Sequence, residues 1–154
     1  MNIRPYRDAD LDELLTAWEA SSRLAHPFLD DDFIAGERRN IAELYLPNTE
    51  SWVCEHDGRV VGFIALIALE AGAEIGGLFV DPAFHGRGFG RALVDHVRPS
   101  RETLEVEVFE ANAIGRAFYD RYGFAPMGRS VHEATGQAVL RLVLPGPGAA
   151  APGA

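Results

Sequence analysis

Lysine is missing from this chain. All 14 basic residues are arginine, and 23 acidic residues outnumber them, which gives a formal net charge of −9 at pH 7. A Walker A phosphate loop requires a lysine, and so does an enzyme that forms a Schiff base, so both classes are excluded. A net negative charge is the wrong sign for a protein that wraps nucleic acid, and we therefore expect no nucleic-acid partner.

Cysteine and long apolar runs are also scarce. Cys54 is the single cysteine, which excludes an internal disulfide and a metal site made of several cysteines. No apolar run approaches the roughly 20 residues that span a bilayer, and the early Asp8, Asp10, Asp12 and Glu13 do not fit a secretory signal. His96 and His132 have no partners at metal-ligand spacing. We therefore expect a cytoplasmic protein without a metal and without a membrane partner.

Size and composition favour one globular domain. The chain has 154 residues, of which 47% are hydrophobic, and this is enough for one core and hardly for two. The segment Pro145 to Ala154 contains only proline, glycine and alanine, so it buries too little surface to offset its ordering entropy. We expect a domain over residues 1–144 and a flexible tail over residues 145–154.

Hydrophobic periodicity and turn signals predict the order β-α-α-β-β-β-α-β-α-β-β. Strands are expected over residues 2–5, 51–55, 59–69, 74–80, 103–109, 124–132 and 137–144. Helices are expected after Asp8, from Asp30 to before Pro47, over residues 88–97, and from Asn112 to about Tyr122. The run Asp30-Asp31-Asp32 supplies the N-cap of the second helix, Asn112 caps the last one, and Gly123 ends it. This order is typical of an α/β domain in which a mixed, twisted sheet of about seven strands has helices on both faces.

Local signals sharpen this expectation. The Asp57-Gly58 step predicts a tight hairpin, with His56 beside it exposed to solvent and Cys54 buried in the preceding strand. Two adjacent glycines in the fourth strand predict a bulge, or a place where another backbone or a ligand comes close. The second helix carries the apolar residues Phe33, Ile34, Ile41, Leu44 and Tyr45. In the last helix, Ile114, Ala117 and Phe118 are expected to face the core.

The most informative segment begins where the strand 74–80 ends. Three alternate glycines, Gly86, Gly88 and Gly90, lead directly into a helix. Without side chains there, successive backbone N–H groups can converge on one point, and the helix dipole adds partial positive charge. We interpret this loop as a cradle for an anion such as a pyrophosphate, with Arg87 and Arg91 as further phosphate contacts; a merely flexible turn is the alternative. The G-x-G-x-G spacing and the mid-chain position do not fit the Rossmann fingerprint.

A second pattern lies on the last helix. Asn112 and Tyr119 are seven residues apart, almost two helical turns, so they lie on one face with Gly115 between them. An amide, a gap and a phenol in line suit a slender, amide-containing ligand whose reactive end lies beside the hydroxyl. The alternative is that Tyr119 only fills the core.

Together the two segments resemble the GNAT superfamily, the acetyl-CoA-dependent N-acetyltransferases. The resemblance covers roughly residues 1–144 and is densest in 75–125. It rests on the segments Leu78-Phe79-Val80-Asp81-Pro82, Gly86-Arg87-Gly88-Phe89-Gly90-Arg91-Ala92-Leu93, Asn112, Ala117-Phe118-Tyr119 and Tyr122-Gly123-Phe124. The early Ala25-His26-Pro27-Phe28-Leu29 is similar to small bacterial members of the YjaB type. His85 departs from the family, which usually has Gln or Arg at this position.

The resemblance implies a site for acetyl-CoA as co-substrate. Backbone groups of Leu78 and Val80 would pair with the pantetheine arm like an added strand, and Asn112 would hydrogen-bond the pantetheine. The amides from Gly86 to Arg91 would hold the pyrophosphate. The implied acetyl-CoA contacts are Leu78, Phe79, Val80, His85, Gly86, Arg87, Gly88, Phe89, Gly90, Arg91, Asn112 and Gly115. His26 and Phe28 would belong to the wall of the acceptor pocket.

The same resemblance implies two catalytic residues. Tyr119 would protonate the departing CoA thiolate. Glu107 lies five residues before the helix-capping asparagine, where bacterial ribosomal-protein acetyltransferases of the superfamily carry a base. It would take the proton that the attacking amine loses, directly or through water. The alternative for Glu107 is a solvated charge on an exposed strand face; Glu74 and Glu105, of which Glu105 shares that face, are further candidates.

These inferences predict an N-acetyltransferase that moves an acetyl group from acetyl-CoA directly to a primary amine of a small molecule or a peptide. The net negative charge favours cationic acceptors such as polyamines, aminoglycosides or lysine-rich peptides. A homodimer is worth testing, because dimerisation is frequent in the family. Two alternatives stay open: a module of the same fold that binds and senses acyl-CoA without turnover, and a nucleotide-binding regulator.

Overall fold

A twisted sheet of seven strands organises the molecule, in the spatial order β1-β2-β3-β4-β5-β7-β6. The computed structural model describes residues 1–146. The strands are β1 (Asn2–Pro5), β2 (Glu50–His56), β3 (Arg59–Leu69), β4 (Gly72–Val80), β5 (Thr103–Phe109), β6 (Ala125–Val131) and β7 (Ala138–Pro145). All neighbouring strands are antiparallel except β4 and β5, which are parallel. The predicted mixed sheet is therefore confirmed.

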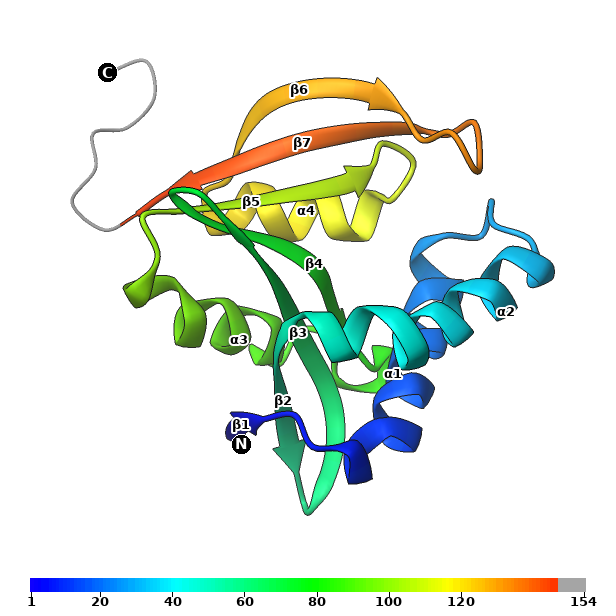
Figure 1. Cartoon of the computed structure of the whole chain (residues 1–154), viewed down its shortest axis with the longest axis vertical. Coiled ribbons are helices and arrows are strands. Elements are labelled where there is room, and N and C mark those ends of the chain that lie inside the picture. The colour runs from blue at the N-terminus through cyan, green and yellow to red at the C-terminus, as the bar shows by residue number, and fades with distance from the viewer. Residues whose placement is uncertain (147–154) are drawn as a thin grey trace.

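Four α-helices cover the two faces of this sheet (Figure 1). They are α1 (Leu11–Ala25), α2 (Asp31–Asn40), α3 (Phe89–Val97) and α4 (Ala113–Tyr122). The core under α1 and α2 contains Leu14, Trp18 and Ile34, and the core under α3 and α4 contains Leu93 and Tyr119. Because helices cover both faces, seven consecutive residues of the central strand β3 are buried.

The C-terminal strand β7 ends at Pro145, the first residue of the predicted tail. The rest of that tail, from residue 147 on, lies outside the described residues. Within residues 1–146, no helix is long and apolar enough to cross a membrane.

Helix α2 follows the predicted cap and then departs from the prediction. Asp30 accepts a hydrogen bond from the Phe33 N–H at 2.8 Å, which is the cap expected from the run of aspartates. The helix is followed by one π-helical turn, Ile41–Tyr45. A π turn is wider than an α turn and rotates the residues within and after it. Leu44 and Tyr45, which the sequence placed in one continuous helix with Ile34, are consequently 54% and 40% exposed.

The face of α4 that packs against the sheet is narrower than predicted. Asn112 caps the helix by accepting a hydrogen bond from the Gly115 N–H at 2.8 Å, and Tyr119 is buried two turns later. Ile114 and Ala117 are exposed, so the expectation that they face the core is wrong. The buried stripe follows the spacing of Asn112, Gly115 and Tyr119, and Ile114 stands beside it at the rim of a groove.

The turn and bulge signals of the sheet are confirmed. Asp57 and Gly58 both have positive φ, 52° and 76°, as a type I′ hairpin requires. Cys54 is fully buried. The register between β3 and β4 shifts by one residue after Ala65 and leaves Gly76 as the extra residue of a bulge. Because a bulge bends its strand, β4 changes direction where its pairing with β5 stops.

Candidate active site

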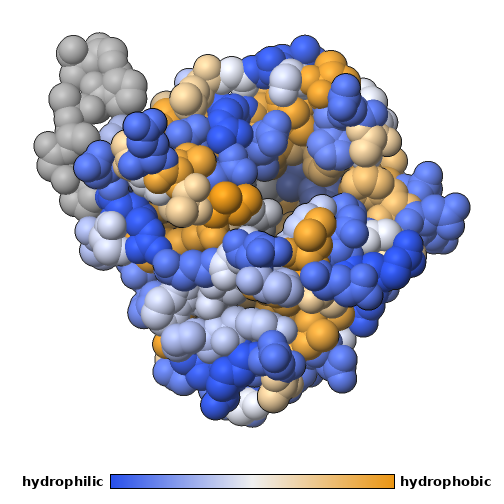
Figure 2. Space-filling model, viewed as in Figure 1, coloured by the Kyte–Doolittle hydropathy of each residue, from blue (hydrophilic) through white to orange (hydrophobic). Residues whose placement is uncertain are grey.

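The parallel strands β4 and β5 separate partway along the sheet. They pair only where Ala73–Ile75 lie beside Leu104–Val106, and two concave surfaces meet beyond this point. The first, called the groove, lies between β4, α3 and α4. The second, called the cavity, lies between α1, α2, β4 and β5. Figure 2 shows a hollow in the face of the molecule that it views, and the rim of this hollow carries both hydrophobic and hydrophilic residues.

The groove has a volume of about 380 Å³. All of the acetyl-CoA contacts that the sequence implies line it, except Arg87: Leu78, Phe79, Val80, His85, Gly86, Gly88, Phe89, Gly90, Arg91, Asn112 and Gly115. Three residues of α4 that the sequence did not assign to this site add apolar surface to the groove: Ile114, Phe118 and Tyr122. A long ligand with an anionic part and an apolar arm therefore fits its lining.

The loop between β4 and α3 has the backbone shape of an anion cradle. Gly86 and Gly88 have positive φ, 74° and 85°, in the region that favours glycine. Gly88 is the N-cap of α3, and the first N–H groups of a helix have no acceptor within the helix. These free donors and the helix dipole attract negative charge. Arg91 adds a guanidinium to the lining of the groove.

The side chain of Arg87 lies away from the groove. Its guanidinium stacks over the rings of Phe84 and Phe89, 5.1 and 5.7 Å from their centroids. His56 packs edge-to-face on the same two rings, and its Nε2 lies 3.5 Å from Arg87 Nη2. His56 is therefore half-buried in this cluster, and the expectation that it is simply solvent-exposed is wrong. The cluster supports the glycine loop through Phe84 and Phe89, whose rings also line the groove.

His85, the departure from the family pattern, has a partner within the protein. Its Nε2 lies 2.8 Å from the carbonyl oxygen of Val80. A carbonyl oxygen only accepts, so His85 Nε2 carries the proton and donates it. This hydrogen bond fixes the glycine loop against the end of β4.

The cavity has a volume of about 270 Å³ and is lined by aromatic and acidic side chains. Its aromatic and histidine residues are Trp18, His26, Phe33, Phe79, Phe109, Tyr119 and His132. Its carboxylates are Glu37, Glu74 and Glu107, and within residues 1–146 no arginine lines it. Carboxylates and aromatic faces both attract a cation, so the lining suits an amine on an apolar stem.

Several cavity residues carried little signal in the sequence. Phe33 and Glu37 of α2 and His132 of the β6–β7 loop reach the cavity from elements far apart in the chain. Phe109 could have been found, because it lies two residues after Glu107 and strand alternation places both on one face. Phe28 does not line the cavity, although it packs edge-to-face behind it on Phe109, with ring centroids 5.3 Å apart.

Arg141 of β7 divides the three candidate bases into two kinds. Its guanidinium hydrogen-bonds Glu74 and, at 2.9 Å, Glu105. Glu107 lies directly across the β5–β7 ladder from Arg141, is exposed, and has no hydrogen bond or ion pair with any residue of the described range 1–146. Of the three carboxylates, Glu107 is the one that can take a proton from a ligand without first losing an arginine.

The groove and the cavity meet at five shared residues: Leu78, Phe79, Asn112, Gly115 and Tyr119. We call this meeting point the junction. It lies where β4 and β5 have separated, between the end of β4 and the first two turns of α4. A ligand in the groove and a ligand in the cavity would be in contact there.

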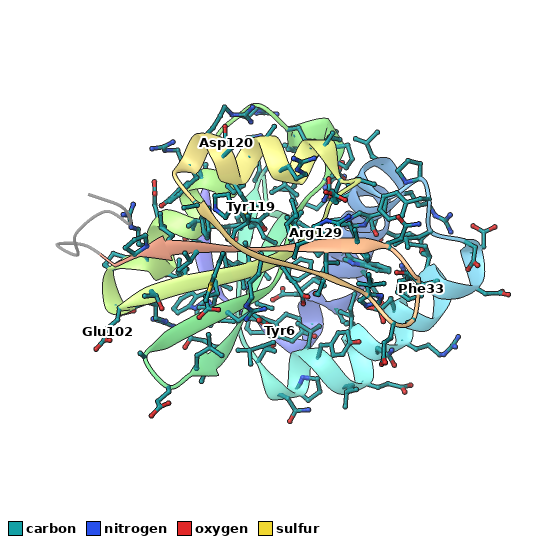
Figure 3. All side chains as sticks on the ribbon, turned by 90° about the horizontal axis from the view of Figure 1, so that it is seen from above. Tyr6, Phe33, Glu102, Tyr119, Asp120 and Arg129 are labelled. Carbon is teal, nitrogen blue, oxygen red and sulfur yellow. The ribbon has the colours of Figure 1, made fainter. Side chains whose placement is uncertain are left out.

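Tyr119 lies at the junction with its ring in the core. Figure 3 shows it on the side of α4 that faces the sheet, whereas Asp120 points away. The ring is 7% exposed, and burial raises the pKa of the Tyr119 hydroxyl well above its ordinary value. The hydroxyl is therefore protonated at neutral pH. It donates to no residue within 1–146, so its proton is available to a ligand.

Asn112 is held on both sides. Its Oδ1 accepts from the Gly115 N–H at 2.8 Å, and its Nδ2 lies 3.2 Å from the Nε2 of His26. Burial lowers the pKa of His26 to about 4, so its ring is neutral at neutral pH. A Cβ on Gly115 would lie 2.5 Å from the Asn112 Nδ2. Glycine at this position therefore leaves room for the amide.

Known proteins share both the sequence pattern and the fold. The Acetyltransferase (GNAT) domain family matches residues 47–126. The peptidyl-lysine N-acetyltransferase YjaB of Salmonella typhimurium is 32% identical over 148 residues, which cover 94% of this chain and 99% of YjaB. The solution structure of apo-form YjaB from Escherichia coli has a TM-score of 0.78 at 29% identity, over 92% of this chain and 95% of that one.

A structure with a bound ligand shares the fold as well. The PaiA N-acetyltransferase of Thermoplasma acidophilum, solved in complex with coenzyme A, has a TM-score of 0.74 at 16% identity and covers 91% of this chain and 96% of its own. The family match and the coverage of YjaB agree with the glycine loop, the Asn112–Tyr119 stripe and the separated strands. The chain therefore belongs to the GNAT acetyltransferase family, and its reaction is acetyl transfer from acetyl-CoA to an amine.

Proposed function

We propose that the acceptor is a cationic primary amine, a lysine side chain of a peptide or a small alkylamine, which enters the cavity and receives the acetyl group directly. The observation that carries this proposal is the junction, where the groove and the cavity share Tyr119 and four other residues. An acyl group at the end of the groove and an amine in the cavity would meet beside the Tyr119 hydroxyl. The relative YjaB is a peptidyl-lysine N-acetyltransferase, which supports a lysine acceptor.

The charge of the cavity supports the cationic acceptor. Three carboxylates line it and, within residues 1–146, no arginine does. Glu74 is compensated by Arg141, whereas Glu107 is not. The formal net charge of −9 adds long-range attraction for cations. A neutral or acidic amine would forgo this attraction.

The groove would hold acetyl-CoA along its length. The amides from Gly86 to Arg91 would contact the pyrophosphate, and the free edge of β4 at Leu78 and Val80 would contact the pantetheine arm. Asn112 would hydrogen-bond the same arm. This arrangement is supported by the positive φ of the loop glycines and by the end of β4–β5 pairing at Ile75.

Two residues would move the protons of the reaction. Glu107 would take the proton that the amine loses on attack, directly or through a water molecule. A nitrogen–carbon bond forms, the carbon–sulfur bond breaks, and Tyr119 would donate its proton to the sulfur. CoA then leaves as a thiol, and the phenolate regains a proton from solvent.

A panel of amines tests the proposal, with release of the free CoA thiol as the readout. We expect turnover with lysine-containing peptides or alkyl diamines and little with amino acids whose amine stands beside a free carboxylate. Binding of acetyl-CoA without thiol release for any amine would instead support a module that senses acyl-CoA. ATP or NAD stabilising the fold more than acetyl-CoA in a thermal-shift comparison would support a nucleotide-binding regulator.

Cytoplasmic location and dimerisation stay predictions. The resemblance to small bacterial acetyltransferases supports both. Light scattering coupled to size-exclusion chromatography tests the homodimer, because the dimer has twice the 16.8 kDa mass of the chain.

A further inference from the structure

His26 joins two segments that meet at the junction. It follows α1 directly and is 8% exposed. Its Nε2 lies 3.2 Å from the Nδ2 of Asn112, the N-cap of α4, and its Nδ1 lies 3.0 Å from the Ser22 hydroxyl oxygen. Phe28 and Phe109 pack edge-to-face on its ring. Both ring nitrogens therefore have partners inside the protein.

The hydrogen bonds around Asn112 determine which nitrogen of His26 carries the proton. The Gly115 N–H is a donor, so the Asn112 atom 2.8 Å from it is the amide oxygen. The other amide atom is Nδ2, which only donates, so the Nε2 of His26 must accept. In a neutral ring the proton then lies on Nδ1 and is donated to Ser22. The four residues form a chain of hydrogen bonds with one direction.

This chain of hydrogen bonds connects opposite sides of the junction. Ser21 and Ala25 of α1 line the groove, whereas Ser22 and His26 line the cavity. From the other side, Asn112 lines both. Within residues 1–146, the His26–Asn112 contact is the one side-chain hydrogen bond between the α1 segment and the α4 segment. The spacing of the two segments at the junction therefore depends on it.

We propose that His26 is a positioning residue, whose Nδ1–H tautomer orients the Asn112 amide and thereby sets the shape of the junction that acetyl-CoA occupies. The role assigned to the junction rests on the proposed function, whereas the direction of the hydrogen bonds is a property of the free protein. Because both nitrogens are engaged, His26 is not the base that deprotonates the amine.

Nitrogen–proton correlation NMR of the imidazole rings tests the direction of these hydrogen bonds in the protein without ligand. We expect His26 to carry its proton on Nδ1 and to have an unprotonated Nε2. In Asn112→Asp the carboxylate has no proton to donate, so we expect the Nε2 of His26 to become protonated. A proton on Nε2 in the wild-type protein would overturn the proposal.

Two substitutions of His26 separate the hydrogen bond from ring packing. His26→Gln extends far enough to offer Asn112 an acceptor in place of Nε2, whereas His26→Asn reaches only the former position of Nδ1 and keeps only the contact with Ser22. Both lose the ring, so we expect their Tm values to fall by similar amounts. The dissociation constant of acetyl-CoA is expected to be about fivefold higher in His26→Asn than in His26→Gln, the effect of about one hydrogen bond.

Calorimetric titration with acetyl-CoA alone measures these constants, so the result does not depend on knowing the amine. His96→Asn is the matched control, because His96 of α3 packs edge-to-face on Trp52 and lines neither the groove nor the cavity. Equal dissociation constants in the two His26 variants would refute the positioning role. Failure of the wild-type protein to acetylate any amine would refute the proposed function and leave this binding comparison intact.

Discussion

Replacing Tyr119 by phenylalanine deletes one hydroxyl and retains the buried ring. That ring packs edge-to-face on Phe118 and Phe124, with centroids 5.3 and 5.1 Å away. Its hydroxyl bonds no residue within 1–146, so the substitution removes no hydrogen bond that holds the fold. We therefore expect Tyr119→Phe to keep the Tm and the acetyl-CoA affinity of the wild-type protein.

The expected effect of Tyr119→Phe falls on turnover. A CoA thiol with a pKa of about 8–9, by analogy with free cysteine, is only a moderately good leaving group, and a proton delivered to the sulfur helps it depart. General acids contribute about 10²–10⁴-fold to a rate, or about 3–5 kcal/mol at about 1.4 kcal/mol for each factor of ten. Because burial keeps the Tyr119 hydroxyl protonated, this contribution is present throughout the neutral range. We expect a loss of at least about tenfold in kcat, a bound set below that range.

Thiol release with a confirmed acceptor measures this loss. Single-turnover mixing establishes that chemistry, and not product release, limits the rate. Turnover of Tyr119→Phe within about twofold of wild type under these conditions would refute the general-acid role. Tyr119 would then be a core residue whose hydroxyl faces the junction by chance.

Three further predictions concern the base, the loop and pH. Glu107→Gln is expected to lower kcat at least about tenfold and to remove the fall in rate at low pH, with acetyl-CoA still bound. In the matched control Glu105→Gln, whose native carboxylate is held by Arg141, the fall in rate at low pH is expected to remain. If this fall also remains in Glu107→Gln, then water or another carboxylate is the base. Gly88→Val adds a branched side chain at a φ of 85°, which costs about 1–2 kcal/mol of stability. We expect this variant to lose acetyl-CoA binding in calorimetry. Unchanged affinity in a folded variant would contradict the anion cradle. Burial lowers the pKa of His26 from 6.5 to about 4. Between these two pH values the unfolded chain therefore binds more protons than the folded protein. Stability is therefore complete above pH 6.5 and falls toward pH 4, by up to about 3 kcal/mol from this group. Urea unfolding of wild type against His26→Gln measures the difference, and identical pH dependence in the two proteins would rule it out.

Local chemistry in the sequence determined most of the fold and half of the site. The Asp57-Gly58 turn, the aspartate cap of α2 and the glycine that ends α4 act within a few residues, so they can be recognised from the chain alone. The glycine loop before α3 is of the same kind, because its conformation follows from missing side chains next to a helix start. The groove that we propose for acetyl-CoA could thus be predicted largely from two short segments, the end of β4 with the glycine loop and the helix α4.

The cavity that we propose for the acceptor was decided by tertiary structure. His26 and Asn112 are 86 residues apart and meet through one hydrogen bond, and Glu107 is distinguished from Glu74 and Glu105 only because the sheet places Arg141 between the latter two. No local pattern encodes such contacts, since they depend on strand order and register. The sequence by itself determined the conformation of the glycine loop that we propose as the binding site of an anionic cofactor arm, because backbone conformation is a local property. Only the folded sheet decided that the Glu107 carboxylate is free of arginine and that the His26 ring holds the Asn112 amide. The pairing of distant side chains is not a local property, because it depends on how the strands and helices are arranged.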